Sequence, residues 1–191
     1  MDGPESLTSA FSDGRSREEQ SFLRWLAEMV VLAAAAFVLA MGIKAFVVQP
    51  FRIPSASMVP TLAVGDRVLV NKYLYRFRSP RRGDIVVFTS PEVAETDLIK
   101  RVIAVGGQTV AVRDGVVYVD GAALSEPYVS AQVPDTYTSE RPAQLPNGYV
   151  WLMGDNRPNS HDSRYFGPQP VRHLLGKAFF IYWPPARMRA L

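Results

Sequence analysis

The stretch TVAVRDGVVYVDG, residues 109–121, decides the fold class because valines recur at alternate positions on both sides of Asp114-Gly115. A period of two places alternate side chains on one face of a strand. Asp-Gly between two such runs is among the strongest short signals for a two-residue hairpin turn. The stretch therefore predicts two antiparallel strands that meet at Asp114-Gly115.

The segments around this hairpin have the same character from Pro50 onward. They are short, rich in β-branched and aromatic residues, and separated by turn pairs such as Arg82-Gly83 and Asn147-Gly148. The further expected strands are RVLVNKYLY (67–75), DIVVFTS (84–90), LIKRVIAV (98–105), YVWLMG (149–154) and KAFFIYW (177–183). This pattern predicts a mainly β domain with an antiparallel sheet, which a long excursion at 125–147 interrupts.

The segment MVVLAAAAFVLAMGI, residues 29–43, carries no charge. It would span about 22 Å as a helix, whereas a bilayer core takes about 20 residues. Lys44 can extend its ammonium toward the headgroups, so that residues 45–48 complete the span. A cleaved signal peptide, with AMG at 40–42 as its cleavage site, and a buried core helix are the alternatives. A transmembrane anchor at 25–48 is favoured, with residues 1–24 as a tail, mobile over the first 20 or so, and 49–191 as the β domain.

The composition excludes several kinds of site. The chain has no cysteine, which rules out a thiol nucleophile, thiolate metal ligands and disulfides. Its two histidines, His161 and His173, are too few for a histidine-rich metal site. The net charge is only +3, because acidic and basic residues are present in similar numbers. The basic residues are not interleaved with aromatic residues as in a nucleic-acid-binding surface. We therefore expect no metal and no nucleic acid partner.

The stretch FRIPSASMVPTL, residues 51–62, offers hydroxyl nucleophiles, since Ser55 and Ser57 lie between two prolines that prevent a helix. A serine nucleophile needs a base. His161 lies next to Asp162, but adjacent side chains point apart, so a solvated histidine is the simpler interpretation. Lys100 shares its expected strand face with Leu98 and Val102, where desolvation would lower its pKa. An edge lysine that discourages aggregation fits the same pattern, and the pattern alone does not choose.

The loop GDNRPNSHDSRYFG, residues 154–167, gathers acids, arginines and serines after an expected strand. It does not fit a calcium-binding EF-hand, because Ser160 stands at the glycine position. We interpret it as a network of Asp–Arg pairs and turns. Such a network either holds a hydroxyl against a buried amine or simply caps the strand.

Five blocks, in this order, resemble bacterial type I signal peptidases. They are PSASMVPTL (54–62), GDRVLV (65–70), RRGDIVVF (81–88), IKRVIAVGG (99–107) and GDNRPNSHDSRYFG (154–167). These enzymes are membrane-anchored serine proteases that use a serine and a lysine. The resemblance extends over nearly the whole chain from residue 25. Because the chain has a single apolar span, it resembles the members of the family with one membrane anchor.

The resemblance implies a role for each matching residue. Ser57 would be the nucleophile and Lys100 the general base, while the Ser55 hydroxyl and the Ser57 amide would form the oxyanion hole. Ser160 would hydrogen-bond the Lys100 amine, with Asp162 and Arg164 supporting it and Asp155 and Arg157 farther away. The pockets for small substrate side chains would be lined by Phe51, Ile53, Leu62, Leu98 and Ile99. The chain departs from the family pattern at Pro158 and His161, neither of which belongs to the implied pair.

The implied reaction is removal of N-terminal signal peptides from exported preproteins at Ala-X-Ala-like sites, through an acyl-enzyme and without a cofactor. The partners would be secretory preproteins, the lipid bilayer and possible translocation machinery. The β domain would lie on the extracytoplasmic side of the plasma membrane, or at the thylakoid membrane in a phototroph, with residues 1–24 in the cytoplasm. The basic run RFRSPRR (76–82) is compatible with anionic lipid or with a solvated turn.

Two further interpretations compete with this one. Self-cleaving damage-response repressors use a similar pair on a related β fold, but they carry a DNA-binding module and no membrane span. Organellar processing peptidases are nearer, and the full loop at 154–167 favours the bacterial or plastid type. The non-enzymatic alternative is a membrane-tethered β domain that binds a secreted partner.

Overall fold

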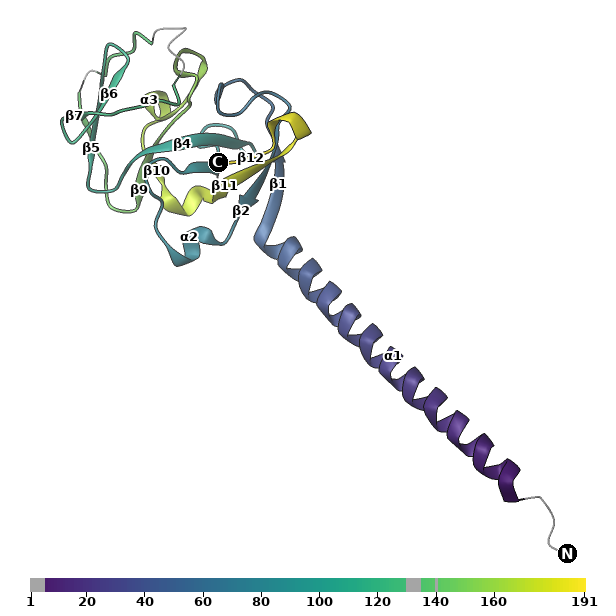
Figure 1. Ribbon diagram of the computed structural model, residues 1–191. Helices are drawn as coiled ribbons and strands as arrows, with labels where there is room; N and C mark the ends of the chain where they lie inside the picture. Colours follow the sequence, from purple (N-terminus) through teal and green to yellow (C-terminus); the bar gives the residue numbers. More distant parts are fainter. Residues whose placement is uncertain (1–5, 130–134, 140) are drawn as a thin grey trace, which may run out of the picture. The chain divides into compact units, whose positions relative to one another are not determined.

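The computed structural model describes residues 6–129, 135–139 and 141–191 (Figure 1). The chain divides into two compact units, Met1–Ala45 and Phe46–Leu191. The first unit is formed by helix α1, Ser6–Val47, which continues into the start of the second.

Helix α1 contains an apolar part long enough to cross a membrane. Within the described residues, Ser21–Gly42 has a mean hydropathy of 2.0, and its 18-residue apolar window is not buried. Exposed apolar side chains such as Phe22, Leu32 and Val38 are unlike those of a core helix. Residues 6–20, which the sequence analysis assigned to the tail, are helical. No proline interrupts the sequence between Pro4 and Pro50, and extending an existing helix is much easier than nucleating one.

The second unit is built on two antiparallel sheets, which confirms the mainly β fold class. The larger sheet has the strand order β1-β2-β11-β3-β4-β9-β10, with β12 paired to β11. Its strands are β1 Val48–Arg52, β2 Arg67–Asn71, β3 Ile85–Thr89, β4 Asp97–Val105, β9 Tyr149–Met153, β10 Gln169–Pro170, β11 Leu174–Trp183 and β12 Arg189–Ala190. The short helices are α2 Leu74–Phe77, α3 Ser163–Phe166, η1 Arg157–Asn159, η2 Val171–His173 and η3 Pro185–Arg187.

The smaller sheet has the order β7-β6-β5-β8 and contains the predicted hairpin. Its strands are β5 Thr109–Arg113, β6 Val116–Val119, β7 Ala122–Ala123 and β8 Ala143–Gln144. Arg113 pairs with Val116, so Asp114 and Gly115 form a two-residue turn, with φ of 48° and 76°. Two positive φ values are what a type I′ turn requires, and the turn prediction is confirmed.

Alternation of side chains explains the cores on the two faces of the larger sheet. One cluster contains Val68, Val70, Ile85, Val87 and Ile181, and the other contains Val86, Phe88, Val102, Val150 and Leu152. Successive residues of β3 thus point to opposite faces, as a central strand covered on both sides requires. The sheet is therefore a rigid base for the loops at its edges.

Two expected segments differ from the structure. The strand expected over 67–75 ends at Asn71 and gives way to α2, because the Asn71 side chain accepts hydrogen bonds from the Tyr73 and Leu74 amides and turns the chain. The expected excursion at 125–147 includes β8, and its residues 130–134 and 140 lie outside the described part of the chain.

Candidate active site

Two buried apolar side chains fix the loop that carries Ser57 to the domain core. Met58 and Leu62 are fully buried in the core cluster that contains Val68, and the Leu62 amide donates to the Met58 carbonyl. The Asn156 amide donates to the Ser57 carbonyl at 3.0 Å, and the Asn156 side chain donates to the Ala56 carbonyl. These contacts fix the backbone on both sides of the Ser57 hydroxyl and join it to the loop after β9.

Strand β4 presents Lys100 to this hydroxyl. The Lys100 Nζ donates to the Ser57 Oγ at 2.8 Å across 43 residues of sequence. The two residues are 3% and 8% exposed. The structure therefore brings together the serine and the lysine that the sequence analysis paired, in a site almost without solvent.

Burial decides the ionisation of this lysine. Desolvation disfavours the ammonium form and lowers the pKa of Lys100 from 10.5 to about 8, partly opposed by the nearby carboxylates of Asp162 and Asp155. Arg164 adds a further lowering contribution. About one lysine in ten is then neutral at pH 7, compared with fewer than one in a thousand at the ordinary pKa. The site thus supplies an amine able to accept a proton near neutral pH.

The loop at 154–167 is a buried ion-pair network, and the two sequence-predicted supporting residues are at its centre. Asp162 accepts from Arg164 Nε at 2.8 Å and from the Gly154 amide at 3.0 Å. Neither side chain of the Asp162–Arg164 pair is exposed. Arg164 also donates to the carbonyls of Arg157 and Ser160 and pairs with Asp135 at 2.6 Å. This network fixes the path of the loop beside Ser57.

Two positioning contacts were not assigned by the sequence analysis. Asp155 forms a bidentate pair with Arg101, the residue next to Lys100, at 2.8 and 2.6 Å. Asn156 binds the nucleophile loop, as described above. The dense block at 154–157 indicated a functional loop, but not which partner each side chain would find.

The two other predicted serines are less well placed in this state. Ser55 Oγ is 3.4 Å from Ser57 Oγ, which is long for a hydroxyl hydrogen bond. The predicted bond from Ser160 to Lys100 is not formed: Ser160 Oγ is buried with no partner among the described residues. Ser160 nevertheless lies close to the site, because a Cβ built on Gly154 would meet both Ser160 and the Ser57 carbonyl. A buried hydroxyl without a hydrogen-bond partner destabilises the fold. The Ser160 hydroxyl is therefore free to donate or accept a hydrogen bond during the reaction.

The five residues implied for substrate pockets do not all lie together. Ile53, Leu62 and Ile99 belong to one buried cluster, with Phe51 packed against it. Leu98 packs against the cluster on the other face of the sheet, as its neighbouring position in β4 requires. Leu62 is fully buried, so it borders a substrate only if the surface above it rearranges.

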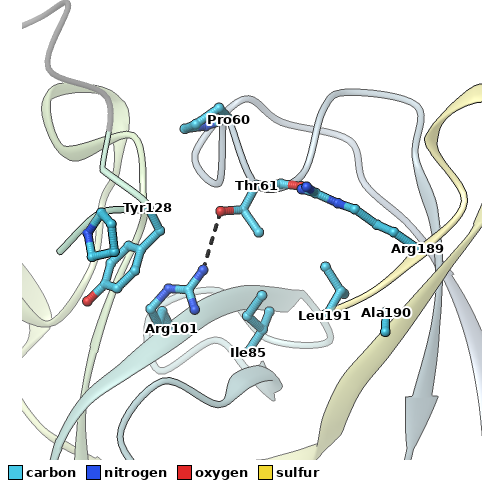
Figure 2. A pocket seen from close by; sticks show the side chains of 9 residues that line it. Pro60, Thr61, Ile85, Arg101, Tyr128, Arg189, Ala190 and Leu191 are labelled. Carbon is cyan, nitrogen blue, oxygen red and sulfur yellow. Dashed lines mark hydrogen bonds between the residues drawn. The ribbon is translucent and has the colours of Figure 1, made fainter.

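A pocket of about 400 Å³ lies beside the nucleophile loop, lined by Pro60, Thr61, Arg101, Tyr128, Arg189 and the C-terminal residues Ala190 and Leu191 (Figure 2). Arg101 donates to the Thr61 hydroxyl across it, at 3.3 Å. The described residues that line it include neither Ser57 nor Lys100, and none of the five implied substrate contacts. The volume of this pocket is therefore no reason to identify it as the reaction site.

His161 does not take part in the pair. Its side chain is 57% exposed, and its Nε2 lies 2.8 Å from Glu92. The ring stacks on Tyr165, with centroids 4.8 Å apart. The neighbouring Asp162 is committed to Arg164 and Gly154. A histidine base for Ser57 is therefore not supported.

Comparison with known proteins identifies the family of the chain. The profile described as "Signal peptidase, peptidase S26" matches residues 26–183. "Probable signal peptidase I-1" of Synechocystis is 43% identical over 86% of this chain and 86% of its own length, and "Signal peptidase I" of Mycobacterium tuberculosis is 40% identical over 85% and 74%. "Probable thylakoidal processing peptidase 2, chloroplastic" of Arabidopsis thaliana is 35% identical over 95% of this chain and 51% of its own length. A solved signal peptidase I from Enterococcus faecalis is 32% identical over 52% of this chain and 97% of its own, with a TM-score of 0.45.

These matches define the class of the protein as a serine peptidase, a hydrolase. The chain belongs to the signal peptidase family, peptidase S26, and resembles its bacterial type I members. One apolar helix in the described residues, together with these relatives, fits a membrane-anchored protein.

Proposed function

We propose that this chain removes signal peptides from exported preproteins by nucleophilic attack of Ser57, with Lys100 as the general base. The observation that carries the proposal is the 2.8 Å contact between Lys100 Nζ and Ser57 Oγ in a buried site. Nucleophile and base within hydrogen-bond reach, with the base held by its surroundings, are the signature of covalent catalysis. The family of the chain supports the same reaction.

The steps follow from the protonation of one amine. Neutral Lys100 accepts the proton of the Ser57 hydroxyl while Ser57 Oγ bonds to the carbonyl carbon of the scissile peptide. As the C–N bond breaks, the Lys100 ammonium gives its proton to the departing amine. Water then adds to the carbonyl carbon of the acyl-enzyme ester and loses a proton to Lys100. As the bond between that carbon and Ser57 Oγ breaks, the Lys100 ammonium returns the proton to Ser57 Oγ, and the carboxyl product is released.

The negative charge that develops on the carbonyl oxygen needs donors. The Ser57 amide is available, since in the described part of the chain no backbone carbonyl accepts from it. Ser55 is exposed and close to Ser57, so its hydroxyl can turn toward the oxygen when substrate arrives. Losing one such donor typically costs about 10² to 10³ in rate.

The substrates we infer are preproteins with Ala-X-Ala-like sites, because the chain belongs to the signal peptidase family and because Phe51, Ile53 and Ile99 pack in the apolar cluster that also contains Met58, the residue next to Ser57. Residues 25–48 would anchor the chain, 1–24 would lie in the cytoplasm and 49–191 would act on the extracytoplasmic side. A preprotein delivered there by the translocation machinery presents its cleavage site at the membrane surface, near a tethered peptidase.

The pH dependence of cleavage tests the base. We expect kcat/KM for a preprotein with an Ala-X-Ala site to rise about tenfold per pH unit below pH 8 and to level off above it, because only the neutral amine accepts the proton. The measurement is the rate of cleavage in detergent between pH 6 and pH 10, with substrate well below KM.

His161→Ala is the matched control, and it should leave both the rate and the profile unchanged because the ring is exposed and paired with Glu92. A profile that levels off near pH 6.5, together with loss of activity in His161→Ala, would assign the base to the histidine and overturn the proposal.

Ser160→Ala tests the proposed orienting role. The hydroxyl is buried with no partner among the described residues, so its removal should not lower the free energy of unfolding. If Ser160 turns to hold the Lys100 amine during the reaction, kcat should fall by roughly 10- to 100-fold. Denaturant titration and single-turnover cleavage, measured on one preparation, separate the two. An unchanged kcat would remove Ser160 from the mechanism.

A further inference from the structure

The segment between β2 and β3 is strongly basic. Residues 72–82 include five basic side chains, Lys72, Arg76, Arg78, Arg81 and Arg82, and no acidic one. All except Arg78 are exposed. We call the surface formed by Lys72, Arg76, Phe77, Arg81 and Arg82 the basic–aromatic surface.

The exposed cations of this surface form no salt bridge within the described part of the chain, although hydrogen bonds from Thr109 and Gln108, and after them the charge of Arg82, lower the pKa of Asp120. The ion pairs of this segment and its surroundings use Arg78 and Lys177, and none among the described residues uses Lys72, Arg76, Arg81 or Arg82. The nearby carboxylate, Asp84, is 6% exposed and is bound by Arg78 and Lys177. Burial alone would raise the pKa of Asp84, but these two cations and the Arg81 amide lower it to about 2. Asp84 is thus committed to the fold, and four cations face solvent.

An aromatic side chain stands in the middle of these cations. Phe77, at the end of α2, is 85% exposed, the highest exposure among the large apolar side chains in the described chain. The opposite side of the segment is fixed, since Tyr75 packs against the core cluster of Phe88 and donates to Asp84. The exposed Phe77 is therefore presented by an ordered segment, and nothing in the core requires it there.

The strand register places this surface next to the point where the chain enters the second unit. Strand β1 pairs with β2 so that Val48, directly after α1, lies opposite Asn71. The basic–aromatic surface begins one residue later, at Lys72, and Figure 1 shows α2 at the end of β2. Five residues separate Gly42, the end of the apolar span, from Val48, so the six steps of chain between them cover at most about 21 Å.

We infer that the basic–aromatic surface binds the anionic headgroups of the membrane that α1 crosses, with Phe77 at the headgroup level. Membrane surfaces offer closely spaced phosphates and an apolar layer beneath them, which matches exposed cations around one exposed phenyl ring. Covalent linkage to the apolar span keeps the surface within reach of one leaflet. This inference goes beyond the proposed function, and it uses from that function only the membrane crossing of α1.

The full chain can report this contact because it has no cysteine of its own. Ser79→Cys, an exposed position inside the surface, is labelled with an environment-sensitive fluorophore and the protein is reconstituted in vesicles. The lipid is phosphatidylcholine with or without phosphatidylglycerol, and brominated lipids serve as quenchers. We expect a blue shift and quenching with phosphatidylglycerol only, weakened by salt. The same label at Val116→Cys, in β6, should respond to neither lipid.

Matched charge variants make the test specific. Arg81→Gln/Arg82→Gln should weaken the contact roughly 25-fold, at about fivefold per cation. Arg113→Gln/Arg141→Gln removes the same charge from exposed positions elsewhere and should leave it unchanged. Phe77→Ser should reduce the quenching by brominated lipids strongly and should change the salt dependence of the contact only slightly.

Equal spectra in the two lipids, or equal effects of the two arginine pairs, would overturn the inference and leave the surface to a protein partner or to solvent. The readout needs no peptide cleavage, so it succeeds or fails independently of Ser57 and Lys100.

Discussion

Lys100→Met is expected to abolish peptidase activity while making the protein more stable at neutral pH. The amine is 3% exposed, and its pKa falls from 10.5 to about 8 on folding because burial disfavours the charge. The unfolded chain therefore binds the proton more tightly, and folding at pH 7 costs on the order of 3 kcal/mol for this one group. Methionine is similar in length and carries no charge, so the free energy of unfolding should rise by about 1–3 kcal/mol.

The pH dependence identifies the cause of that gain. The penalty is fully present below pH 8 and is relieved as pH rises from 8 to 10.5, where the unfolded chain also loses its proton. The stability difference between Lys100→Met and wild type should therefore be largest at pH 7 and should shrink toward pH 10.5. Denaturant titrations at the two pH values measure it, and preprotein cleavage should fall roughly 10⁴-fold.

Ser57→Ala is the companion variant, since it removes the proposed nucleophile and leaves the amine in place. It should be as inactive as Lys100→Met but should keep the wild-type dependence of stability on pH. If Lys100→Met is less stable than wild type at pH 7, the lysine is a structural ion-pair partner. If it still cleaves at a rate near wild type, another base serves Ser57.

Local patterns predicted the parts of the fold that depend on neighbouring residues. The hairpin at Asp114-Gly115 needs only alternating valines and a turn pair that tolerates positive φ, and both can be read from 13 residues. The strands around Val86 and Val102 follow from β-branched runs in the same way. The helical stretch at 6–20 and the turn at Asn71 were missed, because continuation of a helix and side-chain capping are decided by context.

The site was less open to local reasoning, because its ion pairs join distant residues. Asp155 and Arg101 are 54 residues apart, Glu126 and Arg157 are 31 apart, and Asp135 and Arg164 are 29 apart. The sequence of the loop at 154–167 indicated Asp–Arg pairing but suggested partners within the loop. Asp162 and Arg164 do pair there, whereas the other charges are satisfied by strands and loops that only the tertiary fold brings near.

The other large effect expected is from Gly154→Ala, which should displace the nucleophile. Gly154 directly follows β9 and is buried, and a Cβ at this position would lie 2.5 Å from the Ser57 carbonyl oxygen, besides meeting the Ser160 side chain. The carbonyl cannot move alone, because the Asn156 amide holds it at 3.0 Å. The Ser57 backbone must therefore shift, and a displacement of about 1 Å costs roughly 100-fold in rate. Overpacking should also reduce stability by about 1–3 kcal/mol.

Gly106→Ala separates displacement of Ser57 from loss of stability. A Cβ there would also meet backbone, 2.8 Å from the Pro146 carbonyl oxygen, but in the turn between β4 and β5. Both variants should unfold at lower denaturant concentration, and the folded fraction of Gly106→Ala should cleave with the wild-type kcat. Only Gly154→Ala should lose kcat in the folded protein. If both variants keep the wild-type kcat, Ser57 tolerates the shift and the close approach at Gly154 is a packing feature; if both lose it, the defect comes from general destabilisation.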